Sequence, residues 1–246
     1  MGPRTIRRFP APAGAASVPP MTYDLAIGDR AYSSWSLRGW LLLAAFDLPV
    51  RVRRAQMRTP LFAALLEEFA PARTVPALRA PDGSVATDSL AIAEELASRH
   101  PEAGHWPSAP PARAAARSMA AEMHSGYGAL RAACPMNLRT AWRGYAPSAE
   151  VRADLARIDA LWTRALDRSG GPWLFGAYTA ADAFHAPVAA RIAGYALPVS
   201  DGAAAYVERA LTHPSVLRWR REAADDGPDQ AVYDLPHERR PFPFPP

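Results

Sequence analysis

The sequence contains no lysine, so all 28 of its basic side chains are arginines. Together with abundant alanine and proline, this bias is typical of a GC-rich genome and does not by itself indicate phosphate binding. The positive charge is also unevenly placed, because residues 1–20 carry three arginines and no acidic residue. In the remainder 25 basic residues face 24 acidic ones. A surface so close to neutral argues against a nucleic-acid partner.

Cysteine and long apolar runs are scarce as well. Cys134 is the single cysteine, so it cannot form an intramolecular disulfide, and a reducing cytoplasm is the expected location. No Cys/His cluster has the spacing of metal ligands. We interpret Cys134 as a buried structural thiol rather than a nucleophile, because no neighbouring residue would activate it. The longest apolar run, residues 40–46, is far too short to span a membrane, and no membrane association is expected.

Three segments are rich in proline. Residues 1–20 lack the apolar core of a signal peptide, and we interpret them as a disordered extension or as the result of a misassigned start codon ahead of Met21. Residues 101–111 contain four prolines and predict a linker. Residues 227–246 form a Pro-rich tail, and its end, residues 239–246, is expected not to pack regularly.

The hydrophobic pattern changes across the linker. Residues 21–100 predict the order β-α-β-α-β-β-α, with Asp82-Gly83 as a hairpin turn. The expected strands are 23–27, 50–53, 74–80 and 84–87, and the expected helices are 34–47, 59–69 and 89–100. Residues 112–226 predict helices only, at 112–133, 148–168, 180–195, 203–211 and 215–224. The predicted fold is therefore an α/β domain followed by an all-helical domain.

Two serines, Ser33 and Ser34, stand between the first strand and the first helix. The free N–H groups of a helix start favour an anion, and a thiolate is one, so a serine hydroxyl there could donate to a bound thiolate. The alternative is that one of these serines simply caps the helix, and their spacing alone favours the cap. No GxSxG motif or nearby histidine indicates a nucleophilic serine.

Two further features have a similar double interpretation. Pro76 opens a strand. If the Val75–Pro76 bond is cis, the backbone groups of Val75 are free to pair with an extended ligand. The alternative is that Pro76 is an edge-strand proline with no ligand to bind. Asp88 and Ser89 start the third helix. They either cap that helix or hold the ammonium and carboxylate of an amino acid.

In this order the three features resemble the glutathione S-transferase family. SSWSLR is most similar to the Ser-Ser-Cys-Ser-x-Arg motif of its zeta-like bacterial branch, and the resemblance covers residues 21–225. It implies a thioredoxin-like domain, a helical domain and a homodimer. It also implies glutathione as co-substrate and no metal.

The resemblance also assigns roles to single residues. It implies that Ser33, or otherwise Ser34, donates to the glutathione sulfur, and that the backbone of Val75 pairs with the cysteinyl part. Asp88 and Ser89 match the pair that holds the γ-glutamyl end, and Arg38 either touches the ligand or supports the helix. The complete implied glutathione-binding set is Ser33, Ser34, Trp35, Arg38, Val75, Pro76, Asp88 and Ser89.

The second substrate of such proteins lies between the domains, against the first helix of the helical domain. Here Met123 and Tyr127 share one face by spacing, and so do His124 and Arg131, which suits a small and possibly anionic substrate. The alternative is a helix that packs Met123 and Tyr127 into the core. With Trp35, these four residues form the expected acceptor pocket.

The leading prediction is a glutathione transferase, whose thiolate attacks a small electrophile. One alternative is a glutathione-dependent isomerase or dehalogenase similar to maleylacetoacetate isomerase, and another is a binding protein without turnover. The chain departs from the family pattern in three places. Trp35 replaces the zeta-type cysteine, while Thr74 and Ala70 replace a glutamine and an asparagine of the loop before Val75. Trp35 counts against the isomerase, and the two loop changes allow a glutathione site that is weaker or tuned to another thiol.

Thr179 and Asp182 have the spacing of a capping box ahead of an apolar stretch. A similar box starts the buried helix of the second domain in this family. We expect these two residues to contribute to stability and not to chemistry.

Overall fold

A mixed four-stranded sheet forms the centre of the N-terminal domain in the computed structural model, which describes residues 22–244. The expected extension at 1–20 lies outside these residues. The strand order is β2-β1-β3-β4, with β1 parallel to β2 and antiparallel to β3. The strands are β1 (Tyr23–Ile27), β2 (Val50–Arg54), β3 (Ala77–Arg79) and β4 (Val85–Ala86).

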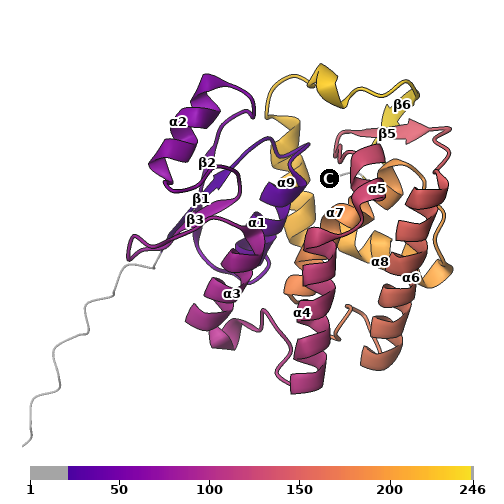
Figure 1. The fold of residues 1–246 in the computed structure, drawn as a ribbon, viewed down its shortest axis with the longest axis horizontal. Coiled ribbons are helices and arrows are strands. Elements are labelled where there is room, and N and C mark those ends of the chain that lie inside the picture. Colours follow the sequence, from indigo (N-terminus) through magenta and orange to yellow (C-terminus); the bar gives the residue numbers. More distant parts are fainter. Residues whose placement is uncertain (1–21, 245–246) are drawn as a thin grey trace, which may run out of the picture.

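Three helices cover this sheet, namely α1 (Ser34–Ala44), α2 (Pro60–Glu68) and α3 (Ser89–Arg99). α1 and α3 lie on the side of the helical domain, and α2 lies away from it (Figure 1). Because α1 is enclosed by the sheet and by the helical domain, its apolar residues are buried almost all around. The predicted order β-α-β-α-β-β-α is confirmed.

Six helices make up most of the second domain, and they are α4 (Pro110–Ser125), α5 (Gly128–Ala133), α6 (Ala149–Ser169), α7 (Ala180–Gly194), α8 (Asp201–Leu211) and α9 (Pro214–Ala224). α7 is the central helix, nearly all of whose residues are buried, and it packs against both α1 and α4. The predicted capping box of Thr179 and Asp182 starts this helix. α7 therefore joins the two domains through α1.

The expectation of one continuous helix at 112–133 is wrong, because α4 ends at Ser125 and α5 begins at Gly128. A Cβ atom at Gly126 would lie 2.6 Å from the carbonyl oxygen of Glu122. Tyr127 has a left-handed backbone with a φ of 54°. The chain therefore turns between the two helices, and spacing across this turn does not tell which residues share a face.

The expected irregular tail and the expected all-helical second domain both need correction. β5 (Thr140–Arg143) pairs in antiparallel register with β6 (Glu238–Pro241). Thr140 and Trp142 point inward from this small sheet, and Phe242 follows it into the core. A four-residue alternation within a helical region is too short to recognise, and the partner strand lies about a hundred residues away.

The linker region is tied to both domains. It contains a short 3-10 helix, η1 (Pro101–Ala103), and then the buried residues His105 and Trp106. His105 Nε2 donates to the carbonyl of Leu42 at 2.8 Å, and its own carbonyl accepts from Ala180 N at 2.8 Å. No helix within residues 22–244 is long and apolar enough to cross a membrane. Cys134 is fully buried, as expected, and burial raises the pKa of its thiol.

Candidate functional site

A cavity of about 490 Å³ lies beside the start of α1, the loop before β3 and the start of α3. These are the three places that the sequence analysis singled out. The residues that line the cavity are Ser33, Trp35, Met57, Arg58, Phe62, Thr74, Val75, Pro76, Thr87, Asp88 and Tyr233. The tertiary structure therefore brings together five of the predicted site residues from positions that are far apart in the sequence.

Ser33 is both the cap of α1 and part of the cavity wall. Its backbone N–H donates to the carbonyl of Asp29 at 2.8 Å, which places the residue at the end of a tight turn. Its Oγ accepts from Ser36 N at 3.2 Å and donates to Ser36 Oγ at 2.8 Å. Ser36 Oγ in turn accepts from Gly28 N at 3.0 Å. The hydroxyl of Ser33 thus ends a short buried chain of hydrogen bonds that opens into the cavity.

Ser34 does not line the cavity, and its side chain contacts the helical domain instead. Its Oγ accepts from Arg191 Nη2 at 3.4 Å, on α7 of the helical domain. Of the two serines, only Ser33 lines the cavity.

The Val75–Pro76 peptide bond is cis, and both residues line the cavity. The ladder between β1 and β3 begins only at Ala77. Within residues 22–244 no residue forms a hydrogen bond with the backbone N–H or C=O of Val75. Because these two groups lie beside the cavity, they are available to an extended ligand.

Asp88 caps α3 and faces the cavity at the same time. Its Oδ1 accepts from Leu90 N at 2.7 Å, while its Oδ2 lies 3.7 Å from His124 Nε2. Ser89 is fully buried behind it and does not line the cavity, and its hydroxyl has no hydrogen-bond partner within residues 22–244. Asp88 therefore offers a negative charge to the cavity, while Ser89 would reach a ligand only through its backbone N–H.

Trp35 separates the cavity from the helical domain. The guanidinium of Arg38 lies 3.9 Å from the centre of its ring, and that of Arg131 lies 5.3 Å away. The His124 ring contacts it edge-on at 5.0 Å. Arg38 is only 1% exposed and does not line the cavity; its Nη1 contacts the sulfur of Met123 at 3.3 Å. Three of the four predicted pocket residues on the helical side therefore gather around Trp35 or its neighbour Arg38.

Tyr127 is the predicted pocket residue that lies elsewhere. The left-handed turn before α5 directs its hydroxyl to Glu122, which accepts at 3.4 Å. Glu122 is also paired with Arg157 on α6 at 2.7 Å. Tyr127 and Met123 are both buried in the same core cluster, as in the alternative in which this helix packs them into the core, and no ring contact between Tyr127 and Trp35 occurs among the described residues.

Positive charge accumulates behind Trp35. Burial lowers the pKa of Arg38 to about 9, and the charges of Arg131 and Arg191 contribute. Burial likewise lowers the pKa of Arg191 to about 10. None of these three arginines forms an ion pair with a carboxylate within residues 22–244. Burial, together with Arg38 and Arg131, lowers the pKa of His124, although Asp88 opposes this. The interdomain region is therefore electropositive.

Several residues of the cavity wall were not predicted from the sequence. Arg58 has a left-handed backbone with a φ of 66°, and it directly precedes Thr59, which caps α2. Tyr233 comes from the tail that was described only as Pro-rich. An arginine after a strand and a tyrosine in a Pro-rich tail carry no pattern that indicates a site, so only the fold could reveal them.

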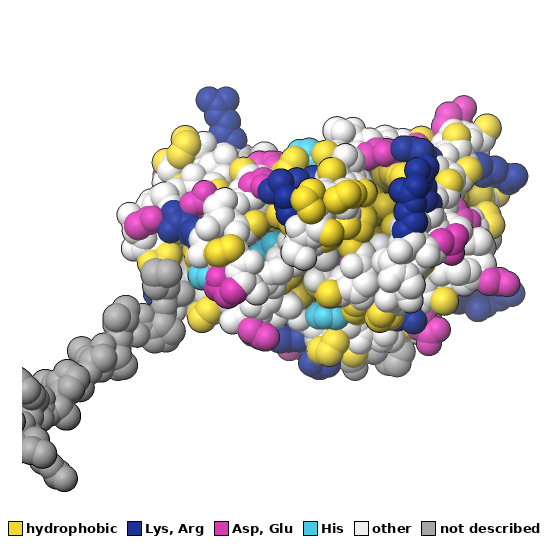
Figure 2. Space-filling model, turned by 90° about the horizontal axis from the view of Figure 1, so that it is seen from below, with side chains coloured by type: hydrophobic (Ala, Val, Ile, Leu, Met, Phe, Trp, Pro, Cys, Tyr) yellow, Lys and Arg dark blue, Asp and Glu magenta, His cyan; other side chains and the backbone are white. Residues whose placement is uncertain are grey.

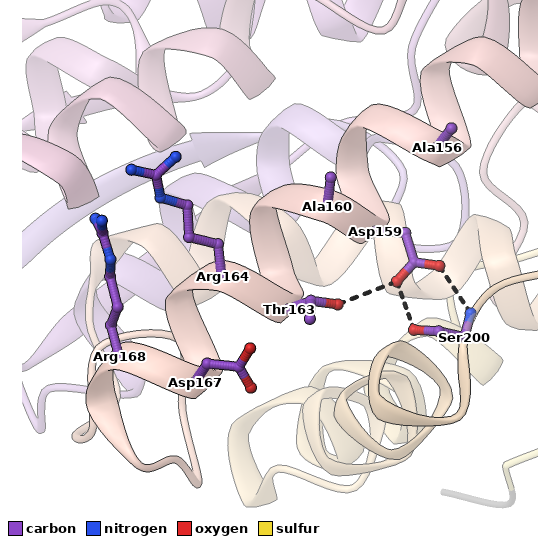
Figure 3. Close-up of a pocket in the computed structure, with 8 residues that line it drawn as sticks. All are labelled: Ala156, Asp159, Ala160, Thr163, Arg164, Asp167, Arg168 and Ser200. Atoms are coloured by element: carbon purple, nitrogen blue, oxygen red, sulfur yellow. Dashed lines mark hydrogen bonds between the residues drawn. The ribbon is translucent and has the colours of Figure 1, made fainter.

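Other hollows lack the predicted residues. The hollow of about 710 Å³ on the outside of α6 is an open depression in which Asp159 accepts from Ser200 N at 2.8 Å (Figure 3). Ser200 caps α8, so Asp159 has a structural role there. Arg164 and Arg168 point away from Asp159 in this view. No group of three or more His, Cys, Asp or Glu side chains suited to a metal ion occurs in the described part of the chain.

Residues 32–99 match the family model of the glutathione S-transferase N-terminal domain. This stretch contains Ser33, Val75 and Asp88. No curated protein matches the chain.

Solved structures share the architecture of most of this chain. A glutathione transferase homologue from Burkholderia gl BGR1 with bound glutathione is 22% identical, with a TM-score of 0.63 over 83% of this chain and 98% of that one. A glutathione transferase from Methylococcus capsulatus is 24% identical, with a TM-score of 0.60 over 82% and 98%. Ure2p in complex with glutathione is 15% identical, with a TM-score of 0.62 over 82% and 99%. At these identities the likeness shows the fold, a thioredoxin-like domain followed by a helical domain, which confirms the predicted fold.

Proposed function

We propose that this chain, which has the glutathione transferase fold, binds glutathione in the 490 Å³ cavity and activates its thiol for attack on a small electrophile. The observation that carries the proposal is the meeting of Ser33, Val75 and Asp88 in one cavity wall. A hydroxyl, a free backbone segment and a carboxylate are the groups that a γ-glutamyl peptide with a thiol requires. They come from three separate elements, and each alone has a purely structural explanation.

Each end of the tripeptide has a partner in this proposal. Asp88 pairs with the ammonium of the γ-glutamyl group, and the backbone of Val75 pairs with the cysteinyl group. Arg58 follows β2 and Asp88 follows β4, the two edge strands of the sheet, so Arg58 lines the cavity on the side away from Asp88. No carboxylate within residues 22–244 forms an ion pair with it. The glycyl carboxylate would be its partner. Thr74 stands where the family has a glutamine, so one side-chain contact is missing from the loop.

The hydrogen-bond chain behind Ser33 explains how the thiolate is stabilised. Both hydroxyls of the Ser33–Ser36 pair can rotate. When Ser36 donates to Ser33 Oγ, the Ser33 proton is free to donate to sulfur, while Gly28 N continues to donate to Ser36 Oγ. The chain of donors and the partial positive charge at the start of α1 both favour a thiolate. Both effects lower the pKa of the bound thiol.

The acceptor lies next to Trp35 in this proposal, between Ser33 and the helical domain. The thiolate forms a bond to an electrophilic carbon, and the leaving group departs with the electron pair of its former bond. His124 and Arg131 are the half-buried groups closest to Trp35. Because three arginines there have no carboxylate partner, we propose that the acceptor carries a negative charge.

Glutathione-agarose retention and conjugation to chlorodinitrobenzene test this function. Ser33→Ala is expected to reduce kcat/KM about tenfold to a hundredfold, the effect of one lost hydrogen bond to a charged group. Ser34→Ala is the matched control, because Ser34 bonds to Arg191 outside the cavity. Failure of the wild type to be retained, together with no effect of Ser33→Ala, would refute the proposal.

A glutathione-dependent isomerase is a second candidate. The electropositive region around Trp35 favours it, because an unsaturated carboxylic acid of the maleylacetoacetate type would find its counter-charge there. The thiolate would add to the double bond and be expelled after rotation, so glutathione would not be consumed. Measuring glutathione consumption during turnover separates the two activities. Binding of glutathione without turnover of any acceptor would instead support the third prediction, a binding protein.

We also propose a homodimer. A groove of about 530 Å³ between α4 and α6 is lined by apolar residues and flanked by arginines, and the view from below shows exposed hydrophobic surface between basic side chains (Figure 2). Sedimentation at micromolar concentration tests this assembly, and Ala115→Arg in the groove is expected to weaken it. The cytoplasmic location stays a prediction.

A further inference from the structure

The C-terminal segment, defined as residues 226–244, crosses from the N-terminal domain to the helical domain (Figure 1). It leaves α9 at Asp226, whose carboxylate pairs with Arg30 at 2.5 Å and with Arg54 at 3.1 Å. Asp226 also accepts from the backbone N–H of Arg30 at 3.1 Å. Two guanidinium groups and one backbone donor therefore hold this end of the segment against the N-terminal domain.

The other end of the segment is held by the helical domain. β6 completes the small sheet with β5, and Phe242 N donates to the carbonyl of Arg139 at 3.1 Å. The Phe242 ring is buried under the guanidinium of Arg220, 4.5 Å away. Because both ends are held, the residues between them form a strap rather than a free tail.

The middle of the strap is attached to Tyr32, the residue directly before Ser33. The Tyr32 hydroxyl donates to Asp229 at 2.9 Å and accepts from Gln230 N at 3.2 Å. Arg139 and Arg239 donate to the same carboxylate, at 3.1 and 2.8 Å. Tyr32 thus connects the strap to the turn that places Ser33 in the cavity.

Tyr233 extends from the strap into the cavity wall. Its ring stacks flat on that of Tyr32, with centres 4.3 Å apart and planes at 2°. It is grouped with Met57 in the same small apolar cluster, and the guanidinium of Arg58 lies 5.8 Å from its ring. Met57 and Arg58 follow β2 and Asp88 follows β4, which are the two edge strands of the sheet. Tyr233, which packs beside Met57 and Arg58, therefore lies on the side of the cavity away from Asp88.

We propose that Tyr233 is a binding residue for the thiol substrate, and that the C-terminal segment is the wall that recognises the end of the substrate remote from its ammonium group. The inference rests on glutathione binding in this cavity. A flat aromatic ring packs well against a peptide backbone, and Arg58 supplies positive charge next to it. The wall therefore selects a tripeptide thiol over a shorter one that does not reach it.

Calorimetric titration of the full chain with glutathione and with γ-glutamylcysteine, which lacks the glycine, tests the inference. Tyr233→Ala is expected to bind glutathione about threefold to tenfold more weakly, as for one lost aromatic contact. Its affinity for γ-glutamylcysteine should change less than about twofold. Tyr233→Phe keeps the ring and should behave as the wild type. Val232→Ala is the matched control, since Val232 is the exposed neighbour outside the cavity wall.

Two outcomes would overturn the inference while leaving the proposed function intact. One is that the wild type binds glutathione and Tyr233→Ala binds it equally well. The other is that the variant weakens both thiols to the same extent. If the wild type binds neither thiol, the proposed function fails first.

Hydrogen exchange gives a second measurement that does not depend on a folded variant. Saturating glutathione should slow exchange in residues 227–235 and in the loop around Val75. It should leave α6, on the other side of the molecule from the cavity, unchanged. Slower exchange around Val75 without any change in 227–235 would contradict the proposal.

Discussion

Replacing Asp182 by alanine removes a carboxylate that is 1% exposed at the start of the central helix α7. Its Oδ2 accepts from Thr179 N at 2.9 Å and from Thr179 Oγ1 at 3.1 Å. Its Oδ1 accepts from Leu174 N at 3.2 Å and from the Tyr206 hydroxyl at 3.0 Å. The carboxylate thus links the capping box to the preceding loop and to α8.

Two opposing effects set the magnitude. Four donors, namely two backbone N–H groups and the hydroxyls of Thr179 and Tyr206, would lose a charged acceptor in a buried place, at about 1.5 kcal/mol each or about 6 kcal/mol together. Against this, burial raises the pKa of Asp182 from 3.8 to about 6. Keeping this buried carboxyl ionised at pH 7 therefore costs the wild type about 3 kcal/mol of stability, and the variant does not bear this cost. The expected loss of stability is therefore about 3 kcal/mol, or a melting temperature roughly 6–12 °C lower.

The sign of the pH dependence follows from the raised pKa. The folded state holds the proton of Asp182 more tightly than the unfolded chain does. Its stabilising contribution to the free energy of unfolding is therefore complete below pH 3.8 and is lost as the pH rises through about 6. The variant has no such group. Its stability deficit relative to the wild type should therefore grow by about 1 kcal/mol as the pH falls from 7 to 5.

Urea unfolding of both proteins at the two pH values measures these differences. Asp159→Ala is the matched control, because this half-buried Asp also accepts from a helix cap, at Ser200 (Figure 3). It should cost about 1 kcal/mol or less. A loss below about 1 kcal/mol in Asp182→Ala would mean that water or relaxation satisfies the donors, and it would refute the reasoning.

Three further predictions concern the site. Ser36→Ala removes the group that lets Ser33 donate outward, so it should raise the pKa of bound glutathione and shift the pH–rate profile of conjugation to higher pH, while Ser98→Ala on the surface of α3 should not. Arg131→Met should raise KM about tenfold for a carboxylate-bearing acceptor and leave a neutral acceptor unchanged, as steady-state kinetics with paired acceptors would show; equal effects on both acceptors would contradict an anionic substrate. Asp229→Asn should loosen the strap, weaken glutathione binding measurably in calorimetry and make hydrogen exchange faster in residues 227–235. Unchanged exchange in these residues would show that Asp229 does not hold the strap in place.

The residues of the sequence determined the local features of this fold. Ser33 and Asp88 cap helices, and Thr179 with Asp182 forms a capping box, as their spacing predicts. The turn at Asp82 also forms, with Ser84 N donating to its carboxylate at 2.9 Å. These hydrogen bonds join residues only two or three positions apart, so the sequence pattern alone contains the information that specifies them.

The tertiary structure decided everything that depends on contacts between distant residues. It placed Ser33 in the cavity and Ser34 against Arg191, a choice that two adjacent serines do not reveal. It turned the chain at Tyr127 and directed the hydroxyl of that residue to Glu122. It also brought Tyr233 to a position beside Tyr32, across about two hundred residues. Such contacts depend on how the two domains pack together, and no short-range pattern in the sequence encodes that packing.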